Sequence, residues 1–85
     1  MKVQTTRPLD RDYARLPDEV KERVDKQLAL LINNPRHPSL RLKKIRGAEG
    51  MWEARVTLGY RMTLQMARDT LILRRIGAHD VLREP

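Results

Sequence analysis

The strongest constraint on the fold of this chain is a pair of alternating segments on either side of Gly59, in MWEARVTLGYRMTLQMA. Apolar and polar residues alternate in both segments, which is the period of a half-buried β-strand. A two-residue turn would set the polar face of one strand against the apolar face of the other. A turn of residues 57–59 avoids this conflict, with Gly59 in the left-handed conformation. The segments therefore predict an antiparallel hairpin in which Val56 pairs with Tyr60.

The predicted hairpin places two arginines side by side. In this register Arg55 lies directly opposite Arg61, and Glu53 lies opposite Thr63 on the same face. Like charges directly across a ladder are destabilising unless something occupies the space between them. A bound anion is the natural occupant, and the alternative is a solvated face on which Glu53 merely bridges Arg55. We interpret the pair as an anion site with a carboxylate beside it.

The segment TLILRRIG, residues 70–77, follows this hairpin and carries apolar residues on both faces. Such a pattern is typical of a strand in the interior of a sheet. The turn before the strand holds either residues 68–69 or residues 68–70, and the sequence leaves both alternatives open. Each alternative adds one arginine to the polar face of the sheet.

The two alternatives differ in which arginine that is. The two-residue turn brings Arg74 beside Thr63. The three-residue turn brings Arg75 there and directs His79 toward Arg61. Both return the end of the chain to the neighbourhood of the predicted anion site.

The first half of the chain predicts helices that cover the sheet. We expect one short strand, two amphipathic helices and a loop, in this order: a strand over residues 2–6, a helix from Pro8 with Leu9, Tyr13 and Leu16 on one side, a helix from Pro17 with Val20, Val24, Leu28 and Leu31 on one side that stops at residues 33–35, and a loop over residues 35–50. The fold class is therefore α+β, with a helix hairpin packed on a three-stranded antiparallel meander. At 85 residues the chain predicts a single domain, residues 1–85.

Charge and composition narrow the function. The formal net charge is +7, and residues 41–85 carry +5 of it. This asymmetry fits a polyanionic partner, because each cation that meets a phosphate releases counterions. There is no cysteine and no apolar run that approaches a membrane span, so we expect a cytoplasmic protein without disulfides, thiolate metal sites or membrane contact.

The chain resembles the RelE/ParE superfamily of bacterial toxins over nearly its whole length. The pieces that carry the resemblance are WEARV, GYRM and the terminal GAHDVL, the last of which resembles the ending of the ribosome-dependent endoribonucleases of the YafQ type. The resemblance implies the RelE-like microbial ribonuclease fold. It also implies a toxin of a type II toxin-antitoxin system that cuts mRNA in the ribosomal A site, inhibits translation and is held inactive by a cognate acidic antitoxin.

The resemblance also implies roles for individual residues. Arg61 would contact the phosphate or the transition state, Arg55 would support it, and His79 would transfer a proton. Where RelE has lysines before this turn, this chain has Glu53 and Arg55, and Glu53 is the complementary proton-transfer group that we expect. Further RNA or phosphate contacts are expected from six basic residues: Arg41, Lys43, Lys44, Arg46, Arg74 and Arg75.

This inventory is consistent with RNA cleavage without a metal or cofactor. The 2′-hydroxyl can attack the adjacent phosphorus if a base, an acid and stabilising cations are present. His79 is suited to proton transfer because histidine titrates near neutral pH. His37 and His79 lack ligand-spaced partners, so we expect no metal site. We expect His37 to be exposed and without a role.

Two other functions remain open at this point. A ParE-like toxin would inhibit DNA gyrase without catalysis, and such toxins generally lack the terminal histidine, so His79 is the discriminating residue. A degenerate module that binds RNA or the ribosome without cleavage is the third reading.

Overall fold

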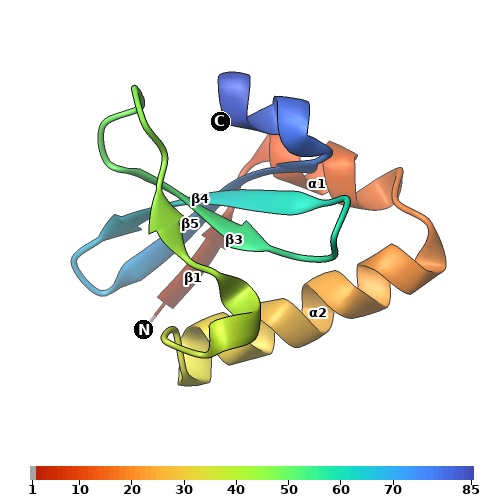
Figure 1. The fold of residues 1–85 in the computed structure, drawn as a ribbon, viewed down its shortest axis with the longest axis horizontal. Coiled ribbons are helices and arrows are strands. Elements are labelled where there is room, and N and C mark those ends of the chain that lie inside the picture. Colours follow the sequence, from red (N-terminus) through yellow and green to blue (C-terminus); the bar gives the residue numbers. More distant parts are fainter. Residues whose placement is uncertain (1) are drawn as a thin grey trace.

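The computed structural model describes residues 2–85, which form a five-stranded sheet with helices on it (Figure 1). The strand order is β1-β5-β4-β3-β2. The strands are β1 Lys2–Thr5, β2 Lys43–Lys44, β3 Met51–Arg55, β4 Arg61–Ala67 and β5 Thr70–Gly77. The helices are α1 Arg7–Ala14 and α2 Asp18–Asn33, with short 3-10 helices η1 Pro38–Leu40 and η2 His79–Arg83. The α+β class and the helix hairpin packed on an antiparallel meander are confirmed.

The sheet has two strands that widen it beyond the meander. β1 pairs with β5 in parallel, and β2 pairs antiparallel with β3. The expectation that residues 35–50 form only a loop was wrong, because η1 and β2 lie within them. β2 forms there because Lys43 and Lys44 hydrogen-bond along the free edge of β3, a tertiary contact that a basic, proline-containing segment does not reveal by its pattern.

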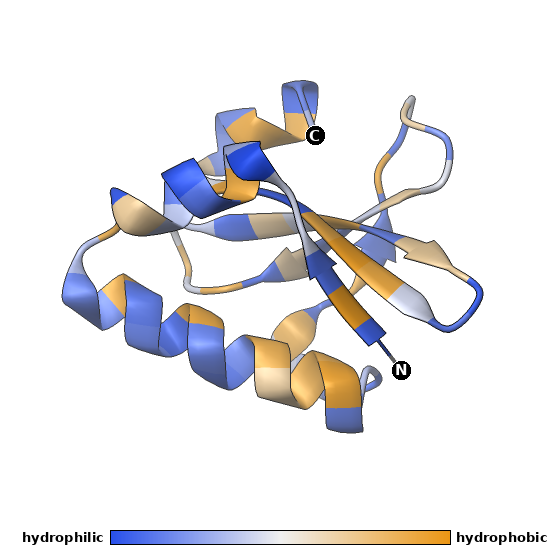
Figure 2. Ribbon diagram, turned by 180° about the vertical axis from the view of Figure 1, so that it is seen from behind, coloured by the Kyte–Doolittle hydropathy of each residue, from blue (hydrophilic) through white to orange (hydrophobic). Residues whose placement is uncertain are grey.

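The core lies between α2 and one face of the sheet. Val24 and Leu31 of α2 are buried there against Ala54, Met62 and Leu64 of the central strands. Figure 2 shows hydrophobic residues concentrated in the strands and in the second half of α2, whereas the first half of α2 is mainly hydrophilic. Each fully buried leucine contributes roughly 1.5–3 kcal/mol to stability relative to an exposed one. No helix within residues 2–85 combines the length and the apolar character that a membrane crossing requires.

The helix boundaries differ slightly from the expected ones. Pro17 is the N-cap residue of α2 and has an extended backbone, so the helix begins at Asp18 instead of at Pro17. The first helix ends at Ala14, and Leu16 is buried from the connecting turn instead of from the helix. α1 begins with a cap from Thr6, whose hydroxyl oxygen accepts from the N–H of Leu9.

The register of the β3–β4 hairpin is the predicted one. Arg55 pairs with Arg61, and Glu53 pairs with Thr63. The expected left-handed Gly59 was wrong, since the positive-φ glycines of residues 2–85 are Gly47 and Gly50. The turn closes without it because other groups supply the hydrogen bonds.

Those bonds come from the two ends of the turn. The N–H groups of Val56 and Thr57 both donate to the carbonyl oxygen of Tyr60, at 3.1 and 3.3 Å. The Thr57 hydroxyl accepts from the N–H of Gly59 at 3.2 Å. Val56 and Thr57 together thus lie opposite Tyr60, as in a β-bulge. This arrangement keeps the side chains of Val56 and Tyr60 on the core face of the sheet without a left-handed residue.

The β4–β5 hairpin combines the two alternatives that the sequence left open. Its turn holds residues 68–69 alone, but a β-bulge shifts the register between Thr63 and Leu64. Beyond the bulge Arg75, not Arg74, lies opposite Thr63. The hydroxyl of Thr6 donates to the carbonyl oxygens of residues 73 and 74, both at 3.1 Å, and so holds the bulged backbone.

Asp12 on α1 fastens the strand beyond this bulge. Its carboxylate accepts from Arg75 Nε at 2.7 Å and from the backbone N–H of Ile76 at 3.0 Å. The hydrogen bond to Asp12 raises the pKa of Arg75 above its usual value, against the opposing effect of burial. The Asp12 carboxylate is only about 15% exposed, so these bonds are partly shielded from water.

We expect Asp12→Ala to destabilise the fold by about 2 kcal/mol, because it removes a charge-assisted bond and leaves a half-buried guanidinium and a backbone N–H unpaired. For a chain of this size the loss corresponds to a drop of roughly 10 °C in melting temperature. Thermal melting by circular dichroism measures it. Asp10→Ala, at an exposed position of the same helix, is the control. Equal melting of the two variants would contradict this role for Asp12.

Candidate functional site

An open cleft of about 520 Å³ lies on the face of the sheet opposite the core. It collects side chains from the segment after η1, from β2, β3 and β4, and from the start of η2. Its lining residues are Arg41, Leu42, Lys43, Glu53, Arg55, Arg61 and His79. All four residues that the sequence proposed as catalytic therefore lie in one cleft. Alternation explains the three on strands, since their neighbours Ala54 and Met62 are fully buried in the core.

Arg61 is held in place by the hairpin turn beside it. Its Nη1 donates to the carbonyl oxygens of Thr57, Leu58 and Tyr60, at 2.9–3.0 Å. Within residues 2–85 its Nε and Nη2 form no hydrogen bond, so one edge of the guanidinium is anchored while the rest is free to bind an anion. A guanidinium fixed in this way loses little side-chain entropy when it binds.

Arg55 lies opposite Arg61 in an unfavourable electrostatic environment. Burial lowers the pKa of Arg55, the charges of Arg61 and Arg41 lower it further, and Glu53 opposes the shift. Its Nε is buried and pairs with no acceptor in residues 2–85. A buried, unpaired donor among like charges is costly. The cluster is therefore under-neutralised, and a bound anion would relieve it.

Among the described residues, 2–85, Glu53 is the one carboxylate that lines the cleft. Its side chain is about 10% exposed, and the only ion pair it forms in residues 2–85 is with Lys43 Nζ at 3.9 Å, near the limit for such a pair. A carboxylate is rarely buried to this extent without cations around it. The cations that line the cleft with Glu53 include Lys43, Arg55 and Arg61.

His79 enters the cleft from the C-terminal segment. It is exposed and is the first residue of η2. Two contacts attach the segment to the sheet: Val81 packs against Gly77, and the buried Thr63 hydroxyl donates to the carbonyl oxygen of Pro85 at 3.2 Å. A Cβ at Gly77 would lie 3.3 Å from Val81, so glycine allows this close packing.

The six expected RNA-contacting residues divide into two groups. Arg41 and Lys43 line the cleft, and Arg46 lies in a hollow next to it. Lys44 has its Nζ over the ring of Trp52, 5.6 Å from the centroid. Arg75 does lie opposite Thr63, as one of the two alternatives predicted, but its side chain binds Asp12 and does not line the cleft. The β-bulge leaves Arg74 exposed and outside the cleft. Both corrections follow from contacts between distant elements.

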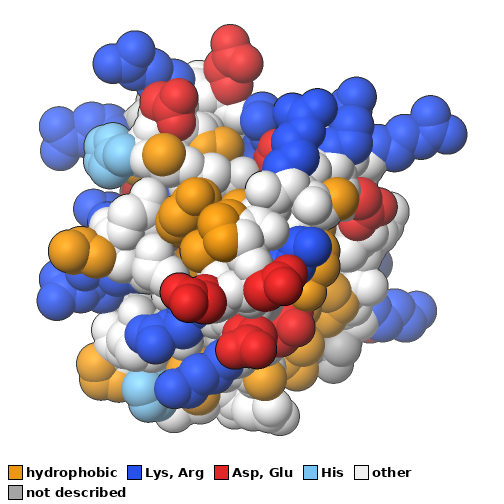
Figure 3. All heavy atoms as spheres, turned by 90° about the vertical axis from the view of Figure 1, so that its right-hand side faces the viewer, with side chains coloured by type: hydrophobic (Ala, Val, Ile, Leu, Met, Phe, Trp, Pro, Cys, Tyr) orange, Lys and Arg blue, Asp and Glu red, His pale blue; other side chains and the backbone are white. Residues whose placement is uncertain are grey.

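Acidic side chains gather away from the cleft. Figure 3 shows several of them close together on another face of the molecule. That face includes the start of α2, whose first turn carries Asp18 and Glu19. The acidic first turn of α2 contributes no residue to the lining of the cleft.

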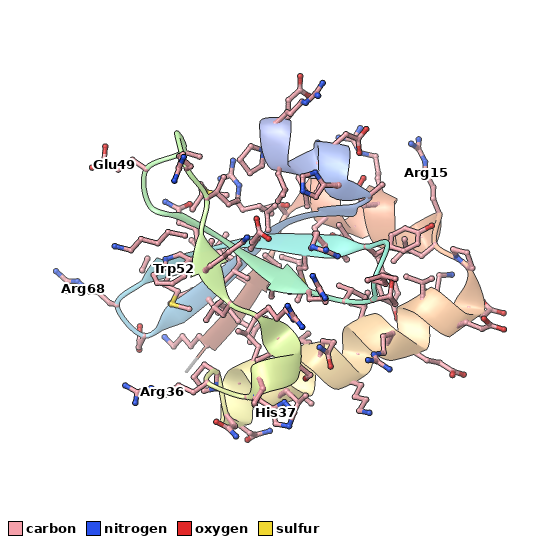
Figure 4. All side chains as sticks on the ribbon, in the orientation of Figure 1. Arg15, Arg36, His37, Glu49, Trp52 and Arg68 are labelled. Atoms are coloured by element: carbon pink, nitrogen blue, oxygen red, sulfur yellow. The ribbon has the colours of Figure 1, made fainter. Side chains whose placement is uncertain are left out.

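His37 does have a structural role, contrary to expectation. It is half-buried and caps η1, where its Nδ1 accepts from the N–H of Ser39 at 3.2 Å. Figure 4 shows His37 beside Arg36, on the far side of the sheet from η2. It therefore lies outside the cleft but supports the segment that leads to Arg41.

Sequence reasoning missed Gln27, which connects α2 to the cleft. It is 1% exposed, and its Nε2 donates to the carbonyl oxygens of Arg55 and Ser39, at 3.0 and 3.3 Å. These bonds fix the backbone beneath Arg55 and the end of η1. The signal was present, since Gln27 occupies a heptad position between Val24 and Leu31 on the buried stripe of the helix.

No group of three or more metal-binding side chains occurs among residues 2–85.

The sequence matches no protein-family model and no curated protein. Solved structures do match over nearly the whole chain. The Escherichia coli DinJ-YafQ toxin-antitoxin complex contains a chain with TM-score 0.80 and 19% identity, covering 95% of this chain and 94% of that one. The fold is that of the RelE and YafQ toxins. RelE from the Methanococcus jannaschii RelB-RelE complex aligns with TM-score 0.71 and 20% identity, covering 95% of each chain. YoeB from Staphylococcus aureus, solved as a dimer, aligns with TM-score 0.77 and 11% identity, covering 93% of this chain and 97% of that chain.

The RelE/YafQ fold explains the arrangement of the cleft. In this chain the meander carries Glu53, Arg55 and Arg61 on one face, and the segment after β5 returns His79 to the same face. The RelE/YafQ fold alone assigns no chemistry to the cleft, which must be argued from its side chains.

Proposed function

We propose that this chain is the toxin of a type II toxin-antitoxin system and that it acts as a ribosome-dependent mRNA endoribonuclease. The observation that carries the proposal is the cleft, in which four cations and a histidine surround one buried carboxylate. Phosphodiester cleavage needs this combination of charge and proton-transfer groups. The cytoplasm, where messages are translated, is the compartment in which it would act.

In the proposed reaction the substrate supplies its own nucleophile. The 2′-hydroxyl of the nucleotide before the cut attacks the adjacent phosphorus, and its proton passes to the Glu53 carboxylate. Arg61 and Arg55 bind the non-bridging oxygens, whose negative charge grows in the transition state. His79, protonated beforehand, gives its proton to the departing 5′-oxygen. The products are a 2′,3′-cyclic phosphate and a free 5′-hydroxyl, and no step requires a metal or cofactor.

The cleft also suits the ribosomal A site as the place of cleavage. It lies at the surface of the sheet, where a strand that the ribosome holds extended can reach it. Arg41 and Lys43 extend its positive charge beyond the two central arginines. Charge of this kind positions a phosphate backbone without reading its sequence.

Transcriptome-wide mapping of mRNA 5′ ends after brief induction tests the proposal. We expect new ends within translated codons, bearing 5′-hydroxyl groups. Cleavage should disappear in Arg61→Ala. Growth arrest with inhibited DNA gyrase and intact messages would instead identify a non-catalytic ParE-like toxin, and ribosome binding without cleavage would identify a degenerate RNA-binding module.

A cognate acidic antitoxin is the partner that we propose, since proteins of this fold have been solved as DinJ-YafQ and RelB-RelE complexes. A chain of net charge +7 with an under-neutralised cleft favours a partner of opposite charge. Co-expression of the neighbouring open reading frame is expected to relieve growth arrest, and the two proteins should co-purify. Affinity measured by calorimetry should fall as salt rises, because charge steers the association. A neighbouring product that leaves the arrest unrelieved would contradict this partner.

A further inference from the structure

A second hollow, of about 510 Å³, adjoins the cleft along β2. The two share Lys43, Glu53 and His79, so the proton-transfer groups of the proposed reaction lie on the boundary between them. The second hollow continues between the segment after β2 and η2. A volume of this size falls within the range of sites that hold small molecules.

The lining of this hollow matches one nucleotide. Its lining includes two apolar residues, the buried Ile45 and the half-buried Leu82. Its rim carries Arg46 and Arg83, which are exposed and form no ion pair with any residue of the described chain, 2–85. Apolar side chains fit the face of a base, and free guanidinium groups fit a phosphate.

Lys44 also borders the hollow, but its ammonium is placed over the ring of Trp52. Lys43, which the hollow shares with the cleft, pairs with Glu53. Among residues 2–85, the cations of the hollow without such a contact are therefore Arg46 and Arg83, one on each side.

We propose that this hollow is the subsite for the nucleotide on the 3′ side of the scissile phosphate. The inference rests on the proposed function, in which His79 protonates the 5′-oxygen that leaves with that nucleotide. Leu82 and Arg83 follow His79 in the same 3-10 helix and form the wall of the hollow. The leaving nucleotide therefore starts at His79 and continues along this wall. The nucleotide on the 5′ side lies over Arg55 and Arg61.

The subsite positions the strand and does not read its bases. Ile45 and Leu82 offer no hydrogen bond to a base edge through their side chains, so any base can lie against them. Arg46 and Arg83 bind the next phosphate along the strand. Loss of these contacts weakens binding more than it slows the chemical step, because none of the four residues touches the reacting atoms.

Single-turnover cleavage of a synthetic message bound in the ribosome tests this subsite. For the double variant Arg46→Ala/Arg83→Ala we expect the half-saturating toxin concentration to rise about tenfold, with the maximal rate changed less than twofold. Arg36→Ala, which removes an exposed arginine far from the hollow, is the matched control and should behave like the parent. A double variant that saturates like the parent overturns the subsite.

Abasic messages test the base contact and the direction of the strand. With an abasic nucleotide on the 3′ side of the cut, the parent should lose affinity several-fold, because the apolar contact of the base with Ile45 and Leu82 is gone. The Leu82→Ala variant should bind the abasic message almost as well as it binds the intact one. The substitution and the missing base remove the same contact, so their effects do not add. A loss confined to an abasic 5′ nucleotide overturns the assigned direction. A parent protein that cleaves no message at all overturns the proposed function instead.

Discussion

His79→Ala is expected to lower the rate of mRNA cleavage by roughly 10²–10⁴-fold, the usual contribution of a positioned proton-transfer group. Its melting temperature should stay close to that of the parent. His79 is exposed, and η2 is held by Val81 and by the bond between Thr63 and Pro85. Ribosome binding should survive, because the arginines of the cleft are unchanged. Single-turnover cleavage and thermal melting measure the two effects.

His79→Gln separates proton transfer from hydrogen bonding. Glutamine can donate a hydrogen bond but cannot give up a proton at neutral pH, so this variant should be as inactive as the alanine variant. His37→Ala is a poor control because it removes the cap of η1. Arg36→Ala, at an exposed position outside the cleft and the hollow, is the better control and should cleave like the parent. Cleavage by His79→Ala at nearly the parental rate would disprove its role as the acid.

Arg61→Lys is expected to lose roughly 10²-fold in cleavage rate, comparable to the loss of one transition-state donor elsewhere. The guanidinium of Arg61 uses Nη1 for three carbonyl oxygens of the turn and keeps its other nitrogens for the phosphate. A lysine ammonium is a point charge that can bind the turn or the phosphate but does not span both. The fold should persist, with a small decrease in melting temperature from the loosened turn. Cleavage kinetics and melting test both statements.

Arg55→Ala is the internal comparison for Arg61→Lys and should cost less activity. Burial and the charges of Arg61 and Arg41 lower the pKa of Arg55, so this cation is held in an unfavourable environment, and removing it partly offsets the lost contact with phosphate. Arg36→Lys controls for the chemical change itself at an exposed site. Parental cleavage by Arg61→Lys would show that a point charge suffices and that the assigned role is wrong.

The polar face of the hairpin could be predicted because strand periodicity is a local property. Alternation with a period of two fixes which side chains share a face, and only one turn length keeps both apolar faces together. These two constraints determine the pairing of Arg55 with Arg61 and place Glu53 beside them. The conformation of Gly59 could not be inferred in the same way, because several sets of hydrogen bonds close a turn of that length.

The sequence by itself determined the α+β class, the two helices, the meander and the face that carries Glu53, Arg55 and Arg61. Only the tertiary structure decided which residues from distant segments complete that face. Asp12 binds Arg75 across 63 positions of the chain and removes it from the site, and Thr6 stabilises the bulge that exposes Arg74. The return of His79 to the cleft follows from the same bulge. Periodicity repeats within one element, whereas a bulge or an ion pair depends on a side chain from another element, which no local pattern contains.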